Sequence, residues 1–322
     1  MVQAENVPWI SQPFGYLPAI GGYPVTNAMV LATLGLILAL LAAVLLAVRK
    51  KKSVPQKTQQ APLEPVSAEN TLAPMKGIRA AYHQNIGARQ DQQDSCTYSD
   101  PALYLQQGIL AVVADGMGGL ANGKAVSATL VRIFEEGFRQ SNPQYSGADL
   151  LLELAVRANS QINQMLMRQD RSGSTLVAAI VRKGYLHFLS VGDSRIYLCR
   201  GGALIQLNRE HIFREELAVK AVNQAVPMNQ VWSDRQAHAL TSYFGIGRIP
   251  HLDRNNEGIK LKEGDRILLA SDGVFSTLTA AQLEAALSGD VQDAANRIGD
   301  MIRAADKPYQ DNNTAVILEY LG

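Results

Sequence analysis

The sequence contains little cysteine and no excess of positive or negative charge. The 322-residue chain contains only Cys96 and Cys199, too few for a disulfide framework or a structural zinc site, and a reduced compartment suits that composition. Its 30 Lys and Arg balance 29 Asp and Glu to a net charge of +1, which gives no reason to expect a nucleic-acid partner. At 47% hydrophobic and 18% charged residues, most of the chain is expected to fold.

One apolar run, residues 28–48, carries no charge at all. As a helix it would span about 30 Å, enough to cross the hydrocarbon core of a bilayer. The basic start of a cleaved signal peptide is missing because no Lys or Arg precedes Arg49, and a buried core helix seldom stays uncharged for so long. Basic residues at 49–52 follow the run, and only Glu5 is charged before it, so the positive-inside rule predicts an outer N-terminus. We expect a single-pass protein of the cell membrane whose C-terminal part is cytoplasmic.

The predicted organisation has four parts. Residues 1–27 form an extracytoplasmic segment without an assigned role, and residues 28–48 form the transmembrane helix. Residues 49–77, basic and then rich in proline (Pro55, Pro62, Pro65 and Pro74), form a tether. The folded domain is expected to occupy residues 78–322.

Within residues 78–322, blocks of strand pattern lie between a few amphipathic helices. Apolar, β-branched runs typical of strands occur at 109–114, 175–182, 185–191, 195–200, 203–207, 266–271 and 314–320. Short turns such as Lys183-Gly184 separate several of them, which indicates antiparallel hairpins. Helical spacing occurs at 126–138 and 152–166, and two further helices are expected to begin after the capping residues Thr279 and Asp290. The pattern predicts an α+β fold, a sandwich of two antiparallel sheets with helices packed outside.

Acidic residues stand where the predicted strands end. Asp115 follows the run 109–114 and Asp272 follows 266–271, each with a glycine next to it that would let the backbone turn sharply. Asp193 and Asp311 lie at two further strand boundaries. Any single Asp-Gly pair is more often an ordinary hairpin turn. Four carboxylates at one sandwich edge would instead suit hard cations such as Mg²⁺ or Mn²⁺, and none of the five histidines has the paired spacing of a zinc site.

Six segments in order along the chain resemble the motifs of the metal-dependent PPM, or PP2C, serine/threonine protein phosphatases. They are ARQDQQDS (88–95), VVADGMGGLANGKAVS (112–127), GSTLVAAIV (173–181), SVGDSRIYLCRGG (190–202), LLASDGVFSTLT (268–279) and DNNTAVIL (311–318). The resemblance covers residues 78–320 and implies a β-sandwich with a two-metal centre at one edge.

The resemblance also implies roles for particular residues. Metal ligands are expected at Asp94, Asp115, Gly116 through its carbonyl, Asp193, Asp272 and Asp311. Asp115 would bridge two Mn²⁺ or Mg²⁺ ions, and Asp193 would help to hold a third, weaker ion. Arg89 is similar to the arginine that clamps the substrate phosphate, a task that suits a planar guanidinium. The phosphate ester would be hydrolysed by a water that bridges the metals, without a nucleophilic side chain.

Two motifs depart from the family pattern. Met117 stands where many relatives have a histidine that is a candidate acid for the leaving group, so the proton donor is unassigned. Gln92 and Gln93 stand where Asn-Glu is common. Residues 208–258 lose periodicity and resemble either a flap beside the active site or a functionally silent insertion.

The expected function is metal-dependent hydrolysis of phosphoserine and phosphothreonine on proteins at the cytoplasmic face of a membrane, opposing a cognate Ser/Thr kinase. Two alternatives remain open. One is a non-catalytic sensor or scaffold with the same fold, and the other is a phosphatase of a small phosphorylated molecule.

Overall fold

The computed structural model describes residues 77–118, 122–166 and 172–322, which belong to one compact unit, Thr71–Gly322. The predicted segments 1–27 and 28–48, and nearly all of the tether, lie outside the described residues. Within the described ranges, no helix is both long and apolar enough to cross a bilayer.

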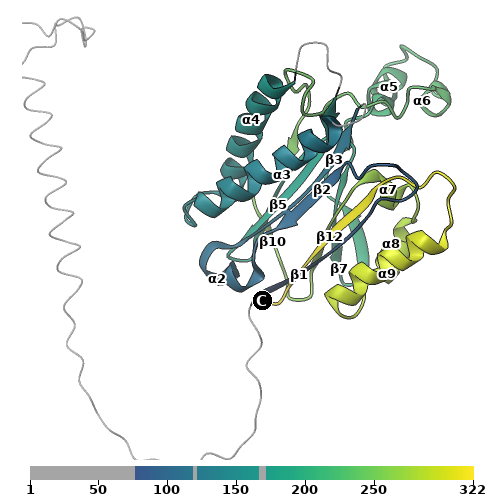
Figure 1. The fold of residues 1–322 in the computed structure, drawn as a ribbon. Coiled ribbons are helices and arrows are strands. Elements are labelled where there is room, and N and C mark those ends of the chain that lie inside the picture. Colours follow the sequence, from purple (N-terminus) through teal and green to yellow (C-terminus); the bar gives the residue numbers. More distant parts are fainter. Residues whose placement is uncertain (1–76, 119–121, 167–171) are drawn as a thin grey trace, which may run out of the picture. The chain divides into compact units, whose positions relative to one another are not determined.

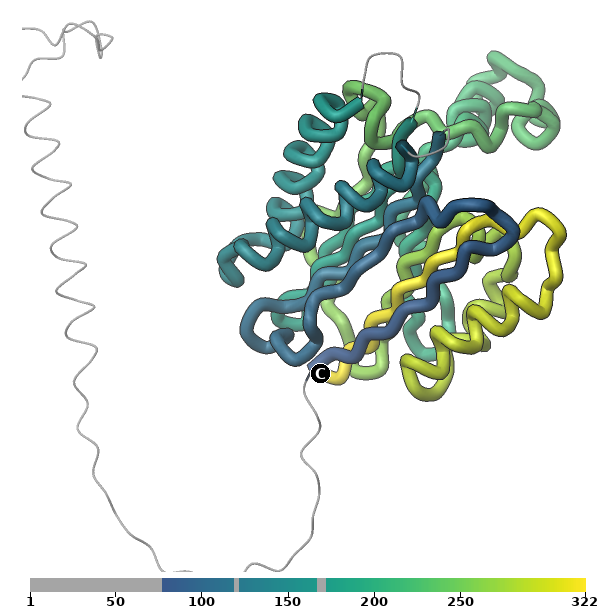
Figure 2. The backbone as a smooth tube through the Cα atoms, viewed as in Figure 1, coloured from purple at the N-terminus to yellow at the C-terminus, as the bar shows by residue number. Residues whose placement is uncertain are grey.

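Two antiparallel sheets make up the centre of the described unit (Figure 1). The first contains, in spatial order, β1 (Ile78–Asn85), β12 (Asn313–Tyr320), β11 (Arg266–Ala270), β7 (Arg195–Arg200) and β8 (Ala203–Gln206). The second contains β10 (Ile259–Lys260), β6 (Tyr185–Val191), β5 (Leu176–Arg182), β3 (Ile109–Met117) and β2 (Asp94–Tyr98), with β4 (Gly173–Ser174) beside β3 and β9 (Asp253–Arg254) beside β6. Figure 2 shows the first strand of the unit lying along the last, with Ile78 opposite Tyr320.

Helices cover the outer faces of both sheets. On the second sheet pack α3 (Asn122–Gln140) and α4 (Gly147–Met165), and on the first pack α8 (Ala280–Ala286) and α9 (Val291–Ala304). Shorter helices complete the unit: η2 (Pro101–Leu103), α2 (Tyr104–Gln107), α5 (Phe213–Val222), α6 (Gln230–Ser233) and α7 (Asp272–Phe275). The predicted α+β sandwich flanked by helices is therefore confirmed for the part of the chain that the structure describes.

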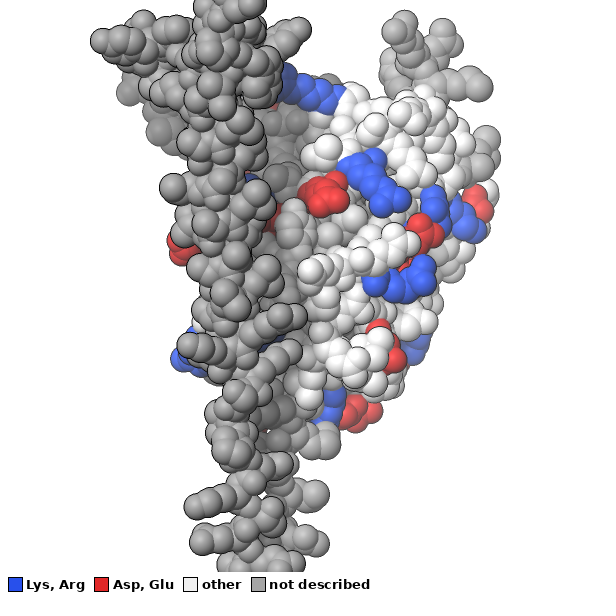
Figure 3. All heavy atoms as spheres, turned by 90° about the vertical axis from the view of Figure 1, so that its left-hand side faces the viewer, with Lys and Arg blue, Asp and Glu red and all other residues white. Residues whose placement is uncertain are grey.

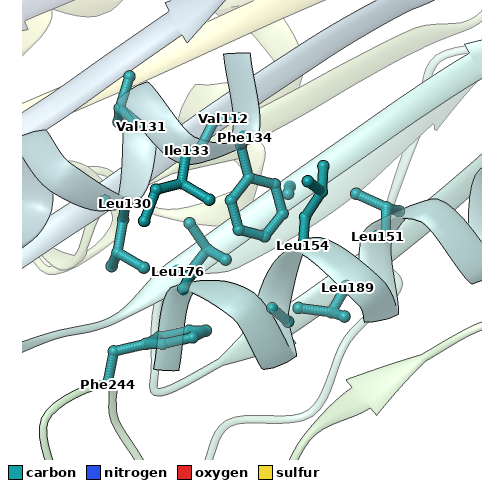
Figure 4. Packing of buried hydrophobic residues seen from close by; sticks show 14 of the residues in the cluster. Val112, Leu130, Val131, Ile133, Phe134, Leu151, Leu154, Leu176, Leu189 and Phe244 are labelled. Atoms are coloured by element: carbon teal, nitrogen blue, oxygen red, sulfur yellow. The ribbon is translucent and has the colours of Figure 1, made fainter. Parts of the chain in front are cut away.

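Burial of the central strands on both faces explains why their sequences read as continuous apolar runs. In β3, Ile109 and Val113 point into the layer between the sheets, whereas Leu110 and Val112 pack under the helices. Figure 4 shows the layer between the second sheet and its helices, where Phe134 of α3 lies beside Leu154 of α4. The fully buried strands hold their ends rigidly, which is what a site at the sandwich edge needs.

The predicted strands agree with the structure to within a residue or two, except that 109–114 continues to Met117 as β3. The capping box at Thr279 and the cap at Asp290 are present. Five strands were not predicted: β1, β2, β4, β9 and β10. β1 and β2 are edge strands that carry several polar residues, and β4, β9 and β10 contain only two residues each. The segment 208–258 contains α5 and α6, which share a small core of their own. Its helical pattern is obscured because Val219 and Val222 of α5 are exposed while Leu217 is buried.

Charge on the surface is mixed. On the face shown in Figure 3, Lys and Arg side chains alternate with Asp and Glu side chains, and neither sign forms a continuous patch there. This distribution agrees with the balanced net charge of the sequence.

Candidate functional site

Five acidic side chains line one open cavity of about 580 Å³, namely Asp91 of the β1–β2 connection and four carboxylates near strand ends. Asp115 lies near the end of β3, Asp193 between β6 and β7, Asp272 at the first position of α7, and Asp311 just before β12. Asp115 thus belongs to the second sheet, Asp272 and Asp311 adjoin strands of the first, and Asp193 lies in the connection between the two sheets. The strand ends meet at one edge of the sandwich, as the sequence predicts.

Asp94 lies behind this group rather than on the cavity wall. It faces Asp115 across the β2–β3 pairing, and only 3% of it is exposed. Its Oδ2 accepts hydrogen bonds from Ser271 Oγ and Thr314 Oγ1, both at 2.8 Å. Its Oδ1 is buried and has no hydrogen-bond partner among the described residues. A buried carboxylate oxygen left in this state is costly unless a cation or a water approaches it.

Gly116 does not form the sharp turn that the sequence led us to expect. It continues β3, where its N–H donates to the carbonyl of Gln93 at 3.1 Å. A Cβ at this position would lie 2.4 Å from the carbonyl oxygen of Gly123 and 2.6 Å from that of Gln93. Glycine is required here because two other backbone segments approach the strand closely, so the Asp-Gly pair is not a hairpin turn.

The electrostatics of the group are those of crowded carboxylates. Burial, followed by the charge of Asp94 and then of Asp272, raises the pKa of Asp115 well above its ordinary value. Burial and the charge of Asp272 raise the pKa of Asp193 to about 7. Burial also raises the pKa of Asp94 to about 6, although the hydrogen bonds from Thr314 and Ser271 oppose it. Bound cations would reverse these shifts, because opposite charge favours the ionised form.

Arg89 also lines the cavity, on a loop that joins β1 to β2. Its Nη2 donates to Oδ2 of Asp311 at 2.6 Å, and 60% of the Arg89 side chain is exposed. The expected phosphate-binding group therefore pairs with an expected metal ligand. An exposed pair of this kind is worth about 0–1 kcal/mol, so other partners can replace it.

The donor set of the cavity bears on which metal ions it could hold. In the described part of the chain, no three His, Cys, Asp or Glu side chains stand in an arrangement that could hold an ion as they are. Asp311 is instead bonded to Arg89, and Asp94 to Ser271 and Thr314. The donors themselves are carboxylates and a strand-end carbonyl, which fit Mg²⁺ or Mn²⁺ and not zinc. The unpartnered Oδ1 of Asp94 fits such an ion or its water shell.

Several residues of the site were not singled out from the sequence. Thr175 lines the cavity, receives the N–H of Asp115 at 3.3 Å and shares a 2.8 Å hydrogen bond with Ser194. Asn312 and Leu240 also line the cavity, the latter from the segment 208–258. Thr175 and Asn312 do lie inside segments that carry the family resemblance, which was the available signal.

The segment 208–258 also contacts the loop that carries Asp193. His211 Nδ1 accepts the N–H of Gly192 at 3.0 Å, and the N–H of His211 donates to the carbonyl of Gly192 at 2.9 Å. Burial lowers the pKa of His211 to about 4, which keeps the imidazole neutral and able to accept this bond. The segment is therefore joined to the site.

Neither a histidine nor a thiolate nucleophile is at hand in the described part of the cavity wall. Met117 lines the cavity where a histidine would be expected, and no histidine is among the described lining residues. Cys96 and Cys199 are both free thiols. Burial raises the pKa of Cys96 to about 12, so its thiol stays protonated at neutral pH.

Comparison with known proteins agrees with this fold. The profile of the family "Protein phosphatase 2C" matches residues 83–312, and the chain belongs to that family. It is 29% identical over 239 residues to the serine/threonine protein phosphatase PstP of Mycobacterium tuberculosis, covering 72% of this chain. The chain spans only 44% of the length of that relative.

Solved structures give the same result. The PPM Ser-Thr phosphatase MsPP of Mycobacterium smegmatis, in complex with cacodylate, has a TM-score of 0.61 and 31% identity, covering 77% of this chain and 100% of that one. The catalytic domain of PstP, in complex with two manganese ions, has a TM-score of 0.62 and 24% identity, with coverage of 77% and 100%. The second likeness shows the fold alone. The names of these relatives support the expectation of a protein serine/threonine phosphatase.

Proposed function

We propose that this protein is a Mn²⁺- or Mg²⁺-dependent phosphatase that hydrolyses phosphoserine and phosphothreonine on other proteins. The observation that carries the proposal is the meeting of Asp115, Asp193, Asp272 and Asp311 with Arg89 around one open cavity. Carboxylates for cations and a guanidinium for phosphate are the two kinds of group that phosphoryl chemistry requires.

The carboxylates would hold the ions. Asp115 would bridge two of them, with the carbonyl of Gly116, Asp272 and Asp311 completing the set. Asp193 would help to hold a third, weaker ion, and the buried Asp94 would act directly or through a water. When bound, such ions supply Lewis acidity toward the phosphoryl oxygens and lower the pKa of a coordinated water.

Arg89 would bind and orient the phosphate of the substrate. Its guanidinium is exposed and, among the described residues, pairs with Asp311 in an exchangeable ion pair, so it can turn toward an incoming phosphate. Thr175 and Ser194, hydrogen-bonded to each other, would keep the loop that carries Asp193 against β5. The residue that protonates the leaving alkoxide is not assigned, since Met117 has no proton to give.

Protein substrates are preferred over small molecules for two reasons. Both relatives described above are named as phosphatases of Ser and Thr residues. The cavity is open and wide, which suits a phosphorylated side chain presented on a protein surface. The scaffold alternative would be favoured by loss of a metal-binding carboxylate, and all the expected acidic positions are filled.

The membrane location is a separate part of the proposal and rests on sequence alone. The uncharged run 28–48 and the basic residues 49–52 support one transmembrane helix with the phosphatase domain in the cytoplasm. A Ser/Thr kinase at the same membrane would supply its substrates. Protease protection of tags at each end of the full chain in intact cells tests the topology: the N-terminal tag should be cleaved from outside and the C-terminal tag protected. The reverse result would contradict it.

The activity is tested with the full-length chain in detergent and a phosphothreonine peptide. Phosphate release should require Mn²⁺, stop with a chelator, and be absent from Asp272→Asn. Turnover by the variant at the wild-type rate would remove Asp272 from the proposed site.

A further inference from the structure

The side chain of Asn312 forms three hydrogen bonds, all with a single loop. Its Oδ1 accepts the N–H of Gln93 at 2.7 Å, and its Nδ2 donates to the carbonyls of Ile86 at 2.8 Å and Asp91 at 3.1 Å. Asn312 is 5% exposed, so these bonds form away from water. All three partners belong to residues 86–93, the loop that carries Arg89, which we call the Arg89 loop.

The Arg89 loop lies directly on the turn that precedes β12. The N–H of Ala88 donates to the carbonyl of Gln310 at 2.8 Å. Gly87 has φ +64°, and a Cβ there would lie 2.3 Å from the carbonyl oxygen of Asp311. The position of Arg89 relative to the carboxylates is therefore set by how the loop sits on residues 310–312. The amide of Asn312 is bonded near both ends of the loop and so fixes its path.

The Asn312 side chain does not itself hold Asp311. The bond to Oδ1 of Asp311, at 2.8 Å, comes from the backbone N–H of Asn312 and would survive truncation of the side chain. The side-chain amide of Asn312 thus bonds the Arg89 loop, while its backbone N–H bonds the expected metal ligand Asp311. A mutation of the side chain removes the first set of bonds and keeps the second.

We propose that Asn312 is a positioning residue that sets the affinity for the substrate phosphate by holding the Arg89 loop, and thereby Arg89, beside the carboxylates. The inference rests on the proposed function, in which Arg89 binds the phosphate. It adds a specific residue to that function, one separated from the loop by more than 200 positions in the sequence.

A competing route runs through the metal ligands. The carbonyl of Gln93 accepts the N–H of Gly116 at 3.1 Å, so movement of Gln93 could disturb the expected ligand Gly116. Ser127 Oγ also donates to that carbonyl, at 2.6 Å, and gives it an anchor that does not depend on Asn312. We therefore expect the loss of the Asn312 amide to disturb the Arg89 loop and to leave Gly116 in place.

The test is a double-mutant cycle in the full-length, Mn²⁺-saturated chain. kcat/KM for a phosphothreonine peptide is measured for wild type, Arg89→Ala, Asn312→Ala and the double variant. Asn312→Ala should lower kcat/KM about 10-fold, chiefly through KM, because a displaced guanidinium engages the phosphate poorly. The double variant should match Arg89→Ala within about twofold, since Asn312 has nothing left to position.

Asn255 provides a matched control. Its Oδ1 accepts the N–H of Phe188 at 2.7 Å, and its Nδ2 donates to the carbonyls of Leu186 at 3.0 Å and Glu257 at 2.7 Å. The set of bonds is the same, but none of these residues lines the cavity. Asn255→Ala should lower the melting temperature by an amount similar to Asn312→Ala and leave kcat/KM unchanged. If Asn312→Ala does not fold, Asn312→Ser goes through the same cycle.

Two results would overturn the proposal. One is additive losses, in which the double variant falls about 10-fold below Arg89→Ala. The other is weaker Mn²⁺ binding by Asn312→Ala in calorimetry, which would place its action on the metal ligands.

The same cycle is measured on the binding of inorganic phosphate to the Mn²⁺-loaded chain, so that it does not depend on turnover. A wild-type chain that binds phosphate without hydrolysing the peptide would contradict the proposed function, and the cycle would still decide the role of Asn312. A wild-type chain that binds no phosphate would overturn both.

Discussion

Arg89 and Asp311, 222 residues apart in the sequence, form a 2.6 Å ion pair on the wall of the carboxylate cavity. The group expected to hold the substrate phosphate thus neutralises a group expected to hold a metal ion. The guanidinium of Arg89 and a metal ion would therefore compete for the carboxylate of Asp311.

Replacement of Arg89 by Ala should act on substrate and metal in opposite directions. kcat/KM should fall about 10- to 150-fold, because charged hydrogen bonds to the phosphate are worth about 1.5–3 kcal/mol. Mn²⁺ affinity should rise by up to about fivefold, since the exposed pair that competes for Asp311 is worth at most about 1 kcal/mol. Steady-state kinetics and calorimetry measure the two effects. An unchanged kcat/KM would remove Arg89 from phosphate binding.

Replacement of Asp115 by Asn should abolish metal binding without harming the fold. Turnover should drop by more than about 100-fold, beyond the usual cost of losing an outer-sphere partner. In the presence of chelator at pH 7.5, the Asp115→Asn variant should melt a few degrees higher than chelated wild type. The uncharged amide avoids the cost of burying a charge and the like-charge repulsion that together raise the pKa of Asp115. A chelated variant that melts below wild type would contradict this electrostatic account.

In the metal-free protein, the contribution of the crowded carboxylates to stability should fall as the pH rises from about 4 to 7. His211, whose pKa is lowered to about 4, contributes in the opposite sense up to its ordinary value of 6.5. Asp94 and Asp193 have folded-state pKa values of about 6 and about 7, above their ordinary value of 3.8. A raised pKa means that the folded state binds protons more tightly, so its contribution is complete at low pH and is lost as the pH passes the folded pKa. The slope should not exceed about 1.4 kcal/mol per pH unit for each group.

This pH profile is measured by urea unfolding in the presence of chelator. Saturating Mn²⁺ should abolish the decline, because bound cations favour the ionised carboxylates. A profile that is flat both in the chelated wild type and in chelated His211→Ala, which lacks the opposing titration, would show that the carboxylates are not crowded as described.

His211→Ala should destabilise the protein by about 1–3 kcal/mol at pH 7, because it leaves the buried N–H of Gly192 without its acceptor. The variant should also need a higher Mn²⁺ concentration for activity, because Gly192 directly precedes the expected metal ligand Asp193. His238→Ala, at an exposed position of the same segment, should stay within about 0.5 kcal/mol of wild type. Equal effects of the two substitutions in chemical denaturation would argue against a role for His211 in holding the loop.

Some features of the fold are readable from sequence and others are not, for physical reasons. β3 and β11 are buried on both faces, so their apolar runs identify them. Both runs lead to the same edge of the sandwich, which brings Asp115 and Asp272 together there. β1 and β2 escape notice because edge strands alternate with polar residues and depend on a distant partner for pairing. In α5 the apolar residues are spread around the helix, which removes the periodicity on which prediction depends.

The same division holds within the site. Residue types and order place Asp115, Asp193, Asp272 and Asp311 correctly on one cavity. The pairing of Arg89 with Asp311, and of Asp94 with Ser271 and Thr314, arises only when the two sheets come together. Likewise, nothing local to Asn312 reveals that its amide bonds a loop near the start of the domain.

The most direct measurement is phosphate release from a phosphothreonine peptide by the full-length chain, with Mn²⁺, with chelator, and with the Asp272→Asn variant. The account predicts Mn²⁺-dependent release that disappears in both other conditions. A folded wild-type chain that binds Mn²⁺ but releases no phosphate, or an Asp272→Asn variant as active as wild type, would contradict it.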